Sequence, residues 1–300
     1  MKKLLHRLFA PVAALLAFGS APASAATAPP TAHPALWAVS DADTTIYLFG
    51  TIHLLPEHYQ WRTPKLDQAV GNSQQLVVET IVDQKNPQKL MQAIASMAFN
   101  TPNLPPLADR VAPEKRAELA SAVKESGLPP QALDKMETWA AAFILLGNQF
   151  RDMGLKGDEG VEIVLRNTFA SEGKPIGELE SNAEQLSFFD RLPESAQRQL
   201  LEGAIDQSSE AKAEFNQMLT SWAKGDVKGI ARSFNHDLAG SPALEQALLK
   251  TRNANWSRWI EQRMAQPGAI MIAVGAGHLA GRDSVIDLLK RDGYRVKRLQ

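Results

Sequence analysis

The chain has 300 residues, of which 44% are hydrophobic and 22% are charged, the composition of a globular protein with a sizeable buried core. It has no cysteine, so disulfide bonds and a lipid-modified cysteine anchor are excluded. The 32 Lys and Arg residues are balanced by 33 Asp and Glu residues, which argues against nucleic acid as a partner because such proteins usually carry a concentrated basic face.

The first 25 residues have the pattern of a secretory signal peptide. Basic residues within the first seven positions precede an apolar run over residues 8–18, and Ala23-Ser24-Ala25 is a small-residue cleavage site. The apolar run is shorter than the roughly 20 residues of a membrane-spanning helix. We therefore expect an exported protein, periplasmic or secreted, with no stable membrane span after cleavage behind Ala25.

Residues 26–34 are rich in Ala, Pro and Thr and are expected to form a flexible exit segment. The domain proper is expected over residues 35–300. Loss of the three basic residues of the signal leaves this chain with a net charge of about −4.

Short runs of strand character lie near both ends of the mature chain. Residues 36–40 and 45–50 are separated by Asp41-Ala42-Asp43, a turn signal that favours an antiparallel hairpin. Further strands are expected over residues 75–80, 174–179 (a brief one), 269–274 and 294–299.

The middle of the chain has a helical character interrupted by proline and glycine. Ser181 followed by Glu184 is the pattern of a capping box at a helix N-terminus. Helices are expected over residues 65–69, 87–98, 113–125, 130–150, 158–172, 194–206, 208–224, 227–236, 242–250, 254–265 and 280–292.

These elements predict an α/β (α+β) fold. Strands come from about residues 35–80 and 269–300, and a large helical insertion covers about residues 87–266. The simplest arrangement is one mixed sheet built from the N- and C-terminal parts of the mature chain.

An apolar run that stops at a glycine three residues before a histidine occurs near each end of the domain. The first ends at Gly50 and leads to His53, and the second ends at Gly275 and leads to His278. A glycine at such a point lets the chain turn off the strand and lets a metal or substrate approach the backbone. We therefore interpret both stretches as parts of a site.

Glu79 follows the apolar run Leu76-Val77-Val78. In open α/β sheets, ligands bind beyond the carboxyl ends of the strands. We therefore expect His53, Glu79 and His278 to meet in one crevice.

Two chemistries suit this residue set. Two histidines and a carboxylate can hold a divalent metal ion with open positions for water and substrate, and the pattern does not choose among Mn²⁺, Co²⁺ and Zn²⁺. In a metal-free alternative, one histidine is the general base for a water molecule, and Glu79 either orients the reacting groups or supplies a proton. A third interpretation is structural, with both histidines as hydrogen-bonded loop residues.

The segment from Gly275 to Ala280 also matches the dinucleotide fingerprint G-x-G-x-x-A. Only 20 residues follow Ala280, and the strand expected over residues 294–299 does not end in Asp or Glu. Nucleotide binding is therefore the weaker interpretation.

Taken together, the motifs resemble the TraB/GumN family, which is related to the Tiki metalloproteases and to a group that includes erythromycin esterases and ChaN-like haem-binding proteins. The similarity spans essentially the whole mature chain. It is carried by Trp37, Tyr47-Leu48-Phe49-Gly50-Thr51-Ile52-His53, Val77-Val78-Glu79, Gly157, Glu159, Glu178-Leu179-Glu180, Arg252-Asn253, Trp256 and Val274-Gly275-Ala276-Gly277-His278-Leu279-Ala280-Gly281.

The resemblance implies a metal-dependent, hydrolase-like site but does not fix a substrate, and our first hypothesis is that this site acts on a peptide or similar amide. His53, Glu79 and His278 match the central residues of the family, and Arg252 and Asn253 match its polar pair before the last strand. Arg252 is expected either to clamp a substrate carboxylate or stabilise an oxyanion, or to form a salt bridge within the helical part of the chain.

Supporting positions are expected at Gly50, Gly275, Gly277, Asn253, Glu159 and Glu180, with the two acids as partners of a metal-bound imidazole. The alternative is a peptide- or haem-binding module without turnover, in which the helical insertion forms the groove. The pattern specifies neither the substrate nor the oligomeric state.

Overall fold

The computed structural model describes residues 32–82, 86–101, 103–206, 209–238 and 240–300. The predicted signal peptide and residues 26–31 of the predicted exit segment lie outside these ranges. No helix of the described chain is both long and apolar enough to cross a membrane.

Six strands form one mixed sheet in the order β4-β3-β5-β2-β1-β6. The four strands β4, β3, β5 and β2 run parallel to one another, whereas β1 is antiparallel to both β2 and β6. The predicted hairpin is confirmed, and so is the mixed α/β fold. The strand bounds are β1 Leu36–Ser40, β2 Thr44–Thr51, β3 Gln75–Val78, β4 Ile176–Glu178, β5 Gly268–Gly275 and β6 Val296–Arg298.

Helices cover both faces of the sheet and fill the space beyond one of its edges. The α-helices are α2 Pro64–Asn72, α3 Pro87–Ala98, α4 Arg116–Ser126, α5 Pro130–Asp134, α6 Thr138–Asp152, α7 Val161–Ser171, α8 Asn182–Asp190, α9 Glu194–Ala204, α10 Ser209–Ala223, α11 Val227–Leu238, α12 Pro242–Glu245, α13 Thr251–Met264 and α14 Val285–Arg291. Short helical turns are η2 Leu107–Asp109, η3 Pro113–Lys115, η4 Gln246–Lys250 and η5 Ala276–Leu279.

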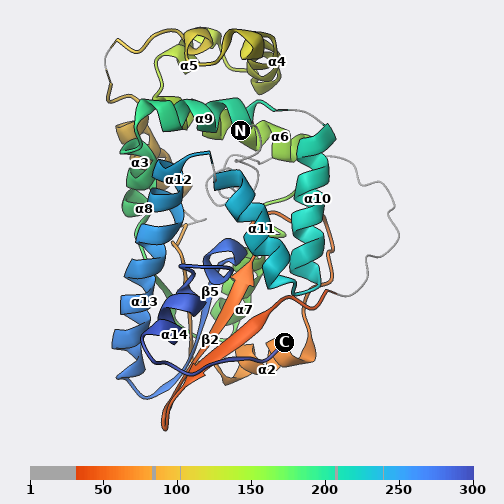
Figure 1. The fold of residues 1–300 in the computed structure, drawn as a ribbon, viewed down its shortest axis with the longest axis vertical. Coiled ribbons are helices and arrows are strands. Elements are labelled where there is room, and N and C mark those ends of the chain that lie inside the picture. The colour runs from red at the N-terminus through yellow and green to blue at the C-terminus, as the bar shows by residue number, and fades with distance from the viewer. Residues whose placement is uncertain (1–31, 83–85, 102, 207–208, 239) are drawn as a thin grey trace.

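Alternate strand residues point to two different apolar cores. Val77 of β3 packs with Trp256 of α13 and Leu289 of α14 on one face. Leu76 and Val78, its neighbours in β3, belong to the larger core on the other face. Figure 1 shows the helices α6 and α9 beyond the end toward which β2 points. The carboxyl ends of the parallel strands therefore point toward this helical part of the chain.

Three features differ from the sequence-based expectations. The brief strand β4 comes from the predicted helical insertion, yet it forms one edge of the sheet. The helix expected over residues 130–150 is two helices, and at the break between them the Arg110 guanidinium donates to the carbonyl oxygens of Asp134 and Met136. The helix expected from residue 280 begins at Val285, after Gly281 and Asp283 adopt positive φ angles.

Candidate functional site

The parallel strands bring the predicted site residues to one edge of the sheet. In the register of the sheet, Thr51 of β2 lies beside Gly275 of β5, and Val78 of β3 lies beside Ala273. The residues that follow these strand ends are His53, Glu79 and the η5 turn that carries His278.

The three side chains surround the face of Gly275 that lacks a side chain. A Cβ atom built on Gly275 would lie 3.2 Å from Oε1 of Glu79, 3.5 Å from Nε2 of His53 and 3.6 Å from Cδ2 of His278. Any larger residue would fill the space between them. The three predicted side chains therefore meet at Gly275, where a Cβ atom would be in contact with all of them.

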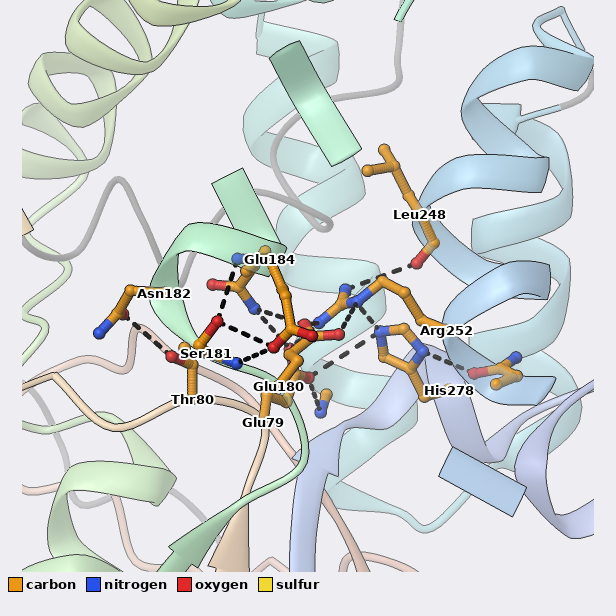
Figure 2. A network of polar contacts seen from close by, with 12 residues as sticks. Glu79, Thr80, Glu180, Ser181, Asn182, Glu184, Leu248, Arg252 and His278 are labelled. Atoms are coloured by element: carbon orange, nitrogen blue, oxygen red, sulfur yellow. Dashed lines mark hydrogen bonds and ion pairs between the residues drawn. The ribbon is translucent and has the colours of Figure 1, made fainter. Parts of the chain in front are cut away.

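Arg252 of α13 is the centre of the polar network in Figure 2. Its Nη2 donates to Oε2 of Glu79 at 2.6 Å and also to Oε1 of Glu180, while its Nε donates to Oε2 of Glu180 at 3.2 Å. Its Nη1 lies 3.2 Å from Nε2 of His278. The side chains of Arg252, Glu79 and Glu180 are at most 7% exposed, so these charges are compensated inside the protein.

Backbone hydrogen bonds align Glu180 with Glu79. The amides of Leu179 and Glu180 donate to the carbonyl oxygen of Glu79, which continues the pairing of β3 and β4 past the end of both strands. Helix α8 then begins with the predicted capping box between Ser181 and Glu184. Within α8, Nε2 of Gln185 donates to both carboxylates, at 3.2 Å to Glu79 and 3.1 Å to Glu180.

His278 is held in one orientation by three neighbours. Its Nδ1 donates to Oδ1 of Asn253 at 2.7 Å, and Nδ2 of Asn253 in turn donates to the carbonyl oxygen of Asp283 at 2.9 Å. The ring packs on Trp256 with a centroid distance of 4.4 Å. With the proton on Nδ1, the lone pair of Nε2 accepts from Arg252. Asn253 therefore fixes the tautomer of His278.

His53 has a separate carboxylate partner. Its Nδ1 lies 2.8 Å from Oε1 of Glu162 in the first turn of α7, and Oγ1 of Thr51 donates to the same oxygen. The His53 side chain is 13% exposed, more than the 5% of His278 and of Glu79. Within the described chain no side chain or amide is bonded to Nε2 of His53, which faces Gly275. This imidazole is the member of the site that is nearest to solvent.

The whole domain matches one known family. The model of the TraB/PrgY/gumN family matches residues 35–298. The chain belongs to this family. It is also similar to the uncharacterized protein YbaP of Escherichia coli, with 23% identity over 86% of this chain and 92% of that protein. YbaP of Shigella flexneri is 24% identical over 81% of this chain and 87% of its own length. No solved structure matches the chain.

The buried ionisable groups of this site, which the TraB/PrgY/gumN family model covers, have shifted pKa values. Burial raises the pKa of Glu79, but Arg252, the two histidines and the amide of Gly275 outweigh this effect and hold the pKa at about 2. Burial, together with the nearby Arg252, lowers the pKa of His278 to about 3. At neutral pH Glu79 is therefore ionised and His278 is neutral.

Two further groups shift in the opposite direction. Burial opposes protonation of His53, but the Glu162 carboxylate outweighs burial and the pKa of His53 is raised. Burial also raises the pKa of Glu180, although Arg252 partly offsets that shift. The pKa values of the two imidazoles are thus shifted in opposite directions, that of His53 upward and that of His278 downward.

The donor atoms bear on the predicted divalent metal. Both imidazoles are oriented through Nδ1, which is the usual preparation for a metal ligand, but only Nε2 of His53 is turned toward Gly275, whereas Nε2 of His278 faces Arg252. However, the Arg252 guanidinium already uses the lone pair of His278 and one oxygen of Glu79, and its charge would repel a cation there. No three His, Asp or Glu side chains of the described chain are placed to hold a metal ion.

The side chains as arranged therefore do not fit the predicted three-ligand set. Metal binding by the protein stays a prediction, and its effect on activity is tested by EDTA dialysis and metal addition.

The other predicted positions have different roles. A Cβ on Gly50 would lie 3.1 Å from Cα of Ala276, and one on Gly277 would lie 2.6 Å from the ring of Phe234, so both glycines allow close packing around η5. Glu159 is half-buried and acts electrostatically on Lys156. Within the described chain it makes no hydrogen bond or ion pair with the site.

Sequence reasoning missed Glu162 and Gln185. Glu162 lies three residues after Glu159, at a helix start where an acid is favourable for the helix alone, and this concealed its contact with His53. Gln185 is a buried amide in a helix, and no local pattern marks it. The only signal in the sequence itself would have been a polar residue close to a predicted strand end.

The stability of the fold should fall as the pH is lowered from about 6.5 to about 3. Because His278 has a pKa of about 3 when folded and an ordinary value of 6.5, the unfolded state binds the extra proton in this range. Each such proton contributes a slope of ~1.4 kcal/mol per pH unit to the free energy of unfolding. Urea unfolding of the wild type and of His278→Gln between pH 4.5 and 6.5 measures this slope.

The slope should be smaller in His278→Gln, which cannot take up the proton in either state. Glu79 adds its own loss of stability only below its ordinary pKa of 4.5, because its folded pKa is about 2. Equal slopes for both proteins above pH 4.5 would contradict a buried neutral His278.

Arg252→Met should destabilise the protein by about 3–5 kcal/mol at pH 7.5, because two buried carboxylates lose their counter-ion. The matched control is the triple variant Arg252→Met, Glu79→Gln, Glu180→Gln, in which no charge is left unpaired. It should recover most of the loss in urea unfolding. A single variant within about 1 kcal/mol of the wild type would show that Arg252 is not the counter-ion.

Proposed function

We propose that this protein is an exported hydrolase in which His53 is the general base for a water molecule that attacks a peptide or similar amide carbonyl. The observation that carries the proposal is the meeting of Nε2 of His53, Oε1 of Glu79 and the ring of His278 at Gly275, where a Cβ atom would lie within 3.6 Å of all three. A general base must be within hydrogen-bond reach of the proton it removes. A water bound between His53 and Glu79 would lie beside a base whose lone pair is not used by the described chain.

His53 and Glu79 would share the handling of the water. One hydrogen of the water would point to Nε2 of His53 and the other to Oε1 of Glu79. His53 takes the first proton as the oxygen attacks the carbonyl carbon, and later gives it to the leaving amine. Glu79 stays ionised because its pKa is about 2, so it orients the water and does not supply the proton.

Arg252 and His278 would act on Glu79 rather than on the substrate. Arg252 is 4% exposed and bonded to two carboxylates, so its guanidinium is not free to clamp a substrate carboxylate in this arrangement. It keeps Glu79 ionised and in place. His278 packs beside this pair as a neutral ring. Of the two roles expected for Arg252, the proposal therefore uses the internal salt bridge rather than the substrate clamp.

The proposal also includes export, which the first 25 residues predict, and a substrate that reaches the site from the side of His53. The alternative form of the same function is a metal-dependent hydrolase. It is favoured by one observation, the meeting of two imidazoles and one carboxylate at Gly275, and activity measured after EDTA dialysis separates the two forms.

The test is cleavage of internally quenched peptides and of p-nitrophenyl acetate by protein dialysed against EDTA, with and without added Mn²⁺, Co²⁺ or Zn²⁺. The dialysed wild type should retain its activity, and His53→Ala should lower kcat/KM by about 10²–10⁴-fold, as is usual for loss of a general base. The rate should rise with pH above 6.5, because the base acts in its neutral form and its pKa is raised. The control is His58→Ala, whose side chain is 83% exposed, and it should match the wild type.

Activity that EDTA abolishes and a metal restores would establish the metal-dependent form instead. Cleavage that survives His53→Ala would come from another source. If no probe is cleaved, the hydrolase proposal fails and a binding module is favoured.

A further inference from the structure

The segment from Lys156 to Glu162 holds the chain around His53 from several sides. Leu55 and Lys156 exchange backbone hydrogen bonds, at 3.1 Å and 3.4 Å. The amide of Val161 donates to the carbonyl oxygen of Ile52 at 3.0 Å. The position of the His53 backbone is therefore set by this segment as well as by β2.

Gly160 makes this approach possible. A Cβ atom at this position would lie 2.1 Å from the carbonyl oxygen of His53, a distance that no side chain permits. With glycine there, α7 begins directly against His53, and Glu162 in its first turn reaches the imidazole. The side chain and the backbone of His53 are thus fixed by neighbouring residues of one segment.

We propose that Glu162 is a positioning residue for His53. It keeps the proton of the neutral ring on Nδ1, so that the lone pair of Nε2 faces Gly275 and Oε1 of Glu79. The hydrogen bond that one imidazole nitrogen makes decides which nitrogen carries the proton. This inference rests on the proposed function for its effect on the rate, but its effect on the tautomer does not depend on any activity.

The surroundings of Glu162 select this role. Its Oε1 accepts from both Thr51 and His53, whereas its Oε2 is buried without a hydrogen-bond partner in the described chain. Leaving one oxygen of a buried carboxylate unpaired is unfavourable. A carboxylate that only interacted with the dipole of α7 would be more stable if it faced solvent, where both oxygens are hydrated. The buried position of Glu162 therefore favours a role in its contact with the His53 imidazole.

The test compares Glu162→Ala, Glu162→Gln and the control Asp158→Ala, an exposed acid of the same segment. The first readout is the ¹⁵N shift of both His53 ring nitrogens, measured where the ring is neutral and assigned by comparison with His53→Gln. Wild type and Asp158→Ala should show the Nδ1–H form. Glu162→Ala should show a substantial Nε2–H population, and Glu162→Gln should stay closer to wild type because its amide oxygen still accepts.

The second readout is the cleavage of the internally quenched peptides and p-nitrophenyl acetate. Glu162→Ala should lower kcat by about 10²-fold or more with little change in KM, with partial rescue in Glu162→Gln, since an oriented base mainly affects the chemical step. An unchanged Nδ1–H tautomer in Glu162→Ala overturns the proposal. If the tautomer changes but the wild type cleaves no probe, Glu162 positions His53 and it is the hydrolase proposal that fails.

Discussion

The contact of one buried guanidinium with two carboxylates and an imidazole is the constraint on which this site depends. Arg252 compensates Glu79 and Glu180 and donates to His278, and these residues come from three distant parts of the chain. Removing one partner would leave uncompensated charge in an interior where charge is costly. The ends of β3, β4 and β5 are therefore linked to α13 by electrostatics as well as by packing.

The Arg252 guanidinium is itself the cation at the centre of the site. Glu79 needs a positive neighbour to stay ionised when buried, and Arg252 provides it. His53 is outside this group of compensated charges and has its own carboxylate, which raises its pKa, whereas His278 stays neutral. The site thus divides into a buried part that fixes charge and an outer part that can exchange a proton.

Sequence reasoning reached the fold class and the meeting of His53, Glu79 and His278, because strand ends and glycines are local signals and parallel strands share one carboxyl edge. It also found Arg252 and Asn253 through the family resemblance. It did not find that Arg252 is turned toward the carboxylates, nor that Glu162 rather than Glu159 reaches the site. Both depend on where helices begin and on their packing against the sheet, which the local sequence does not determine.

The most direct test of the central claim is a crystal structure from crystals grown with Zn²⁺ or Mn²⁺, with anomalous diffraction data collected for the added metal. The account predicts that the Arg252 guanidinium lies between Glu79 and Glu180 and within hydrogen-bond distance of His278. It also predicts no anomalous peak between His53, Glu79 and His278. An ion bound to these three side chains, with Arg252 turned away from Glu79, would contradict it.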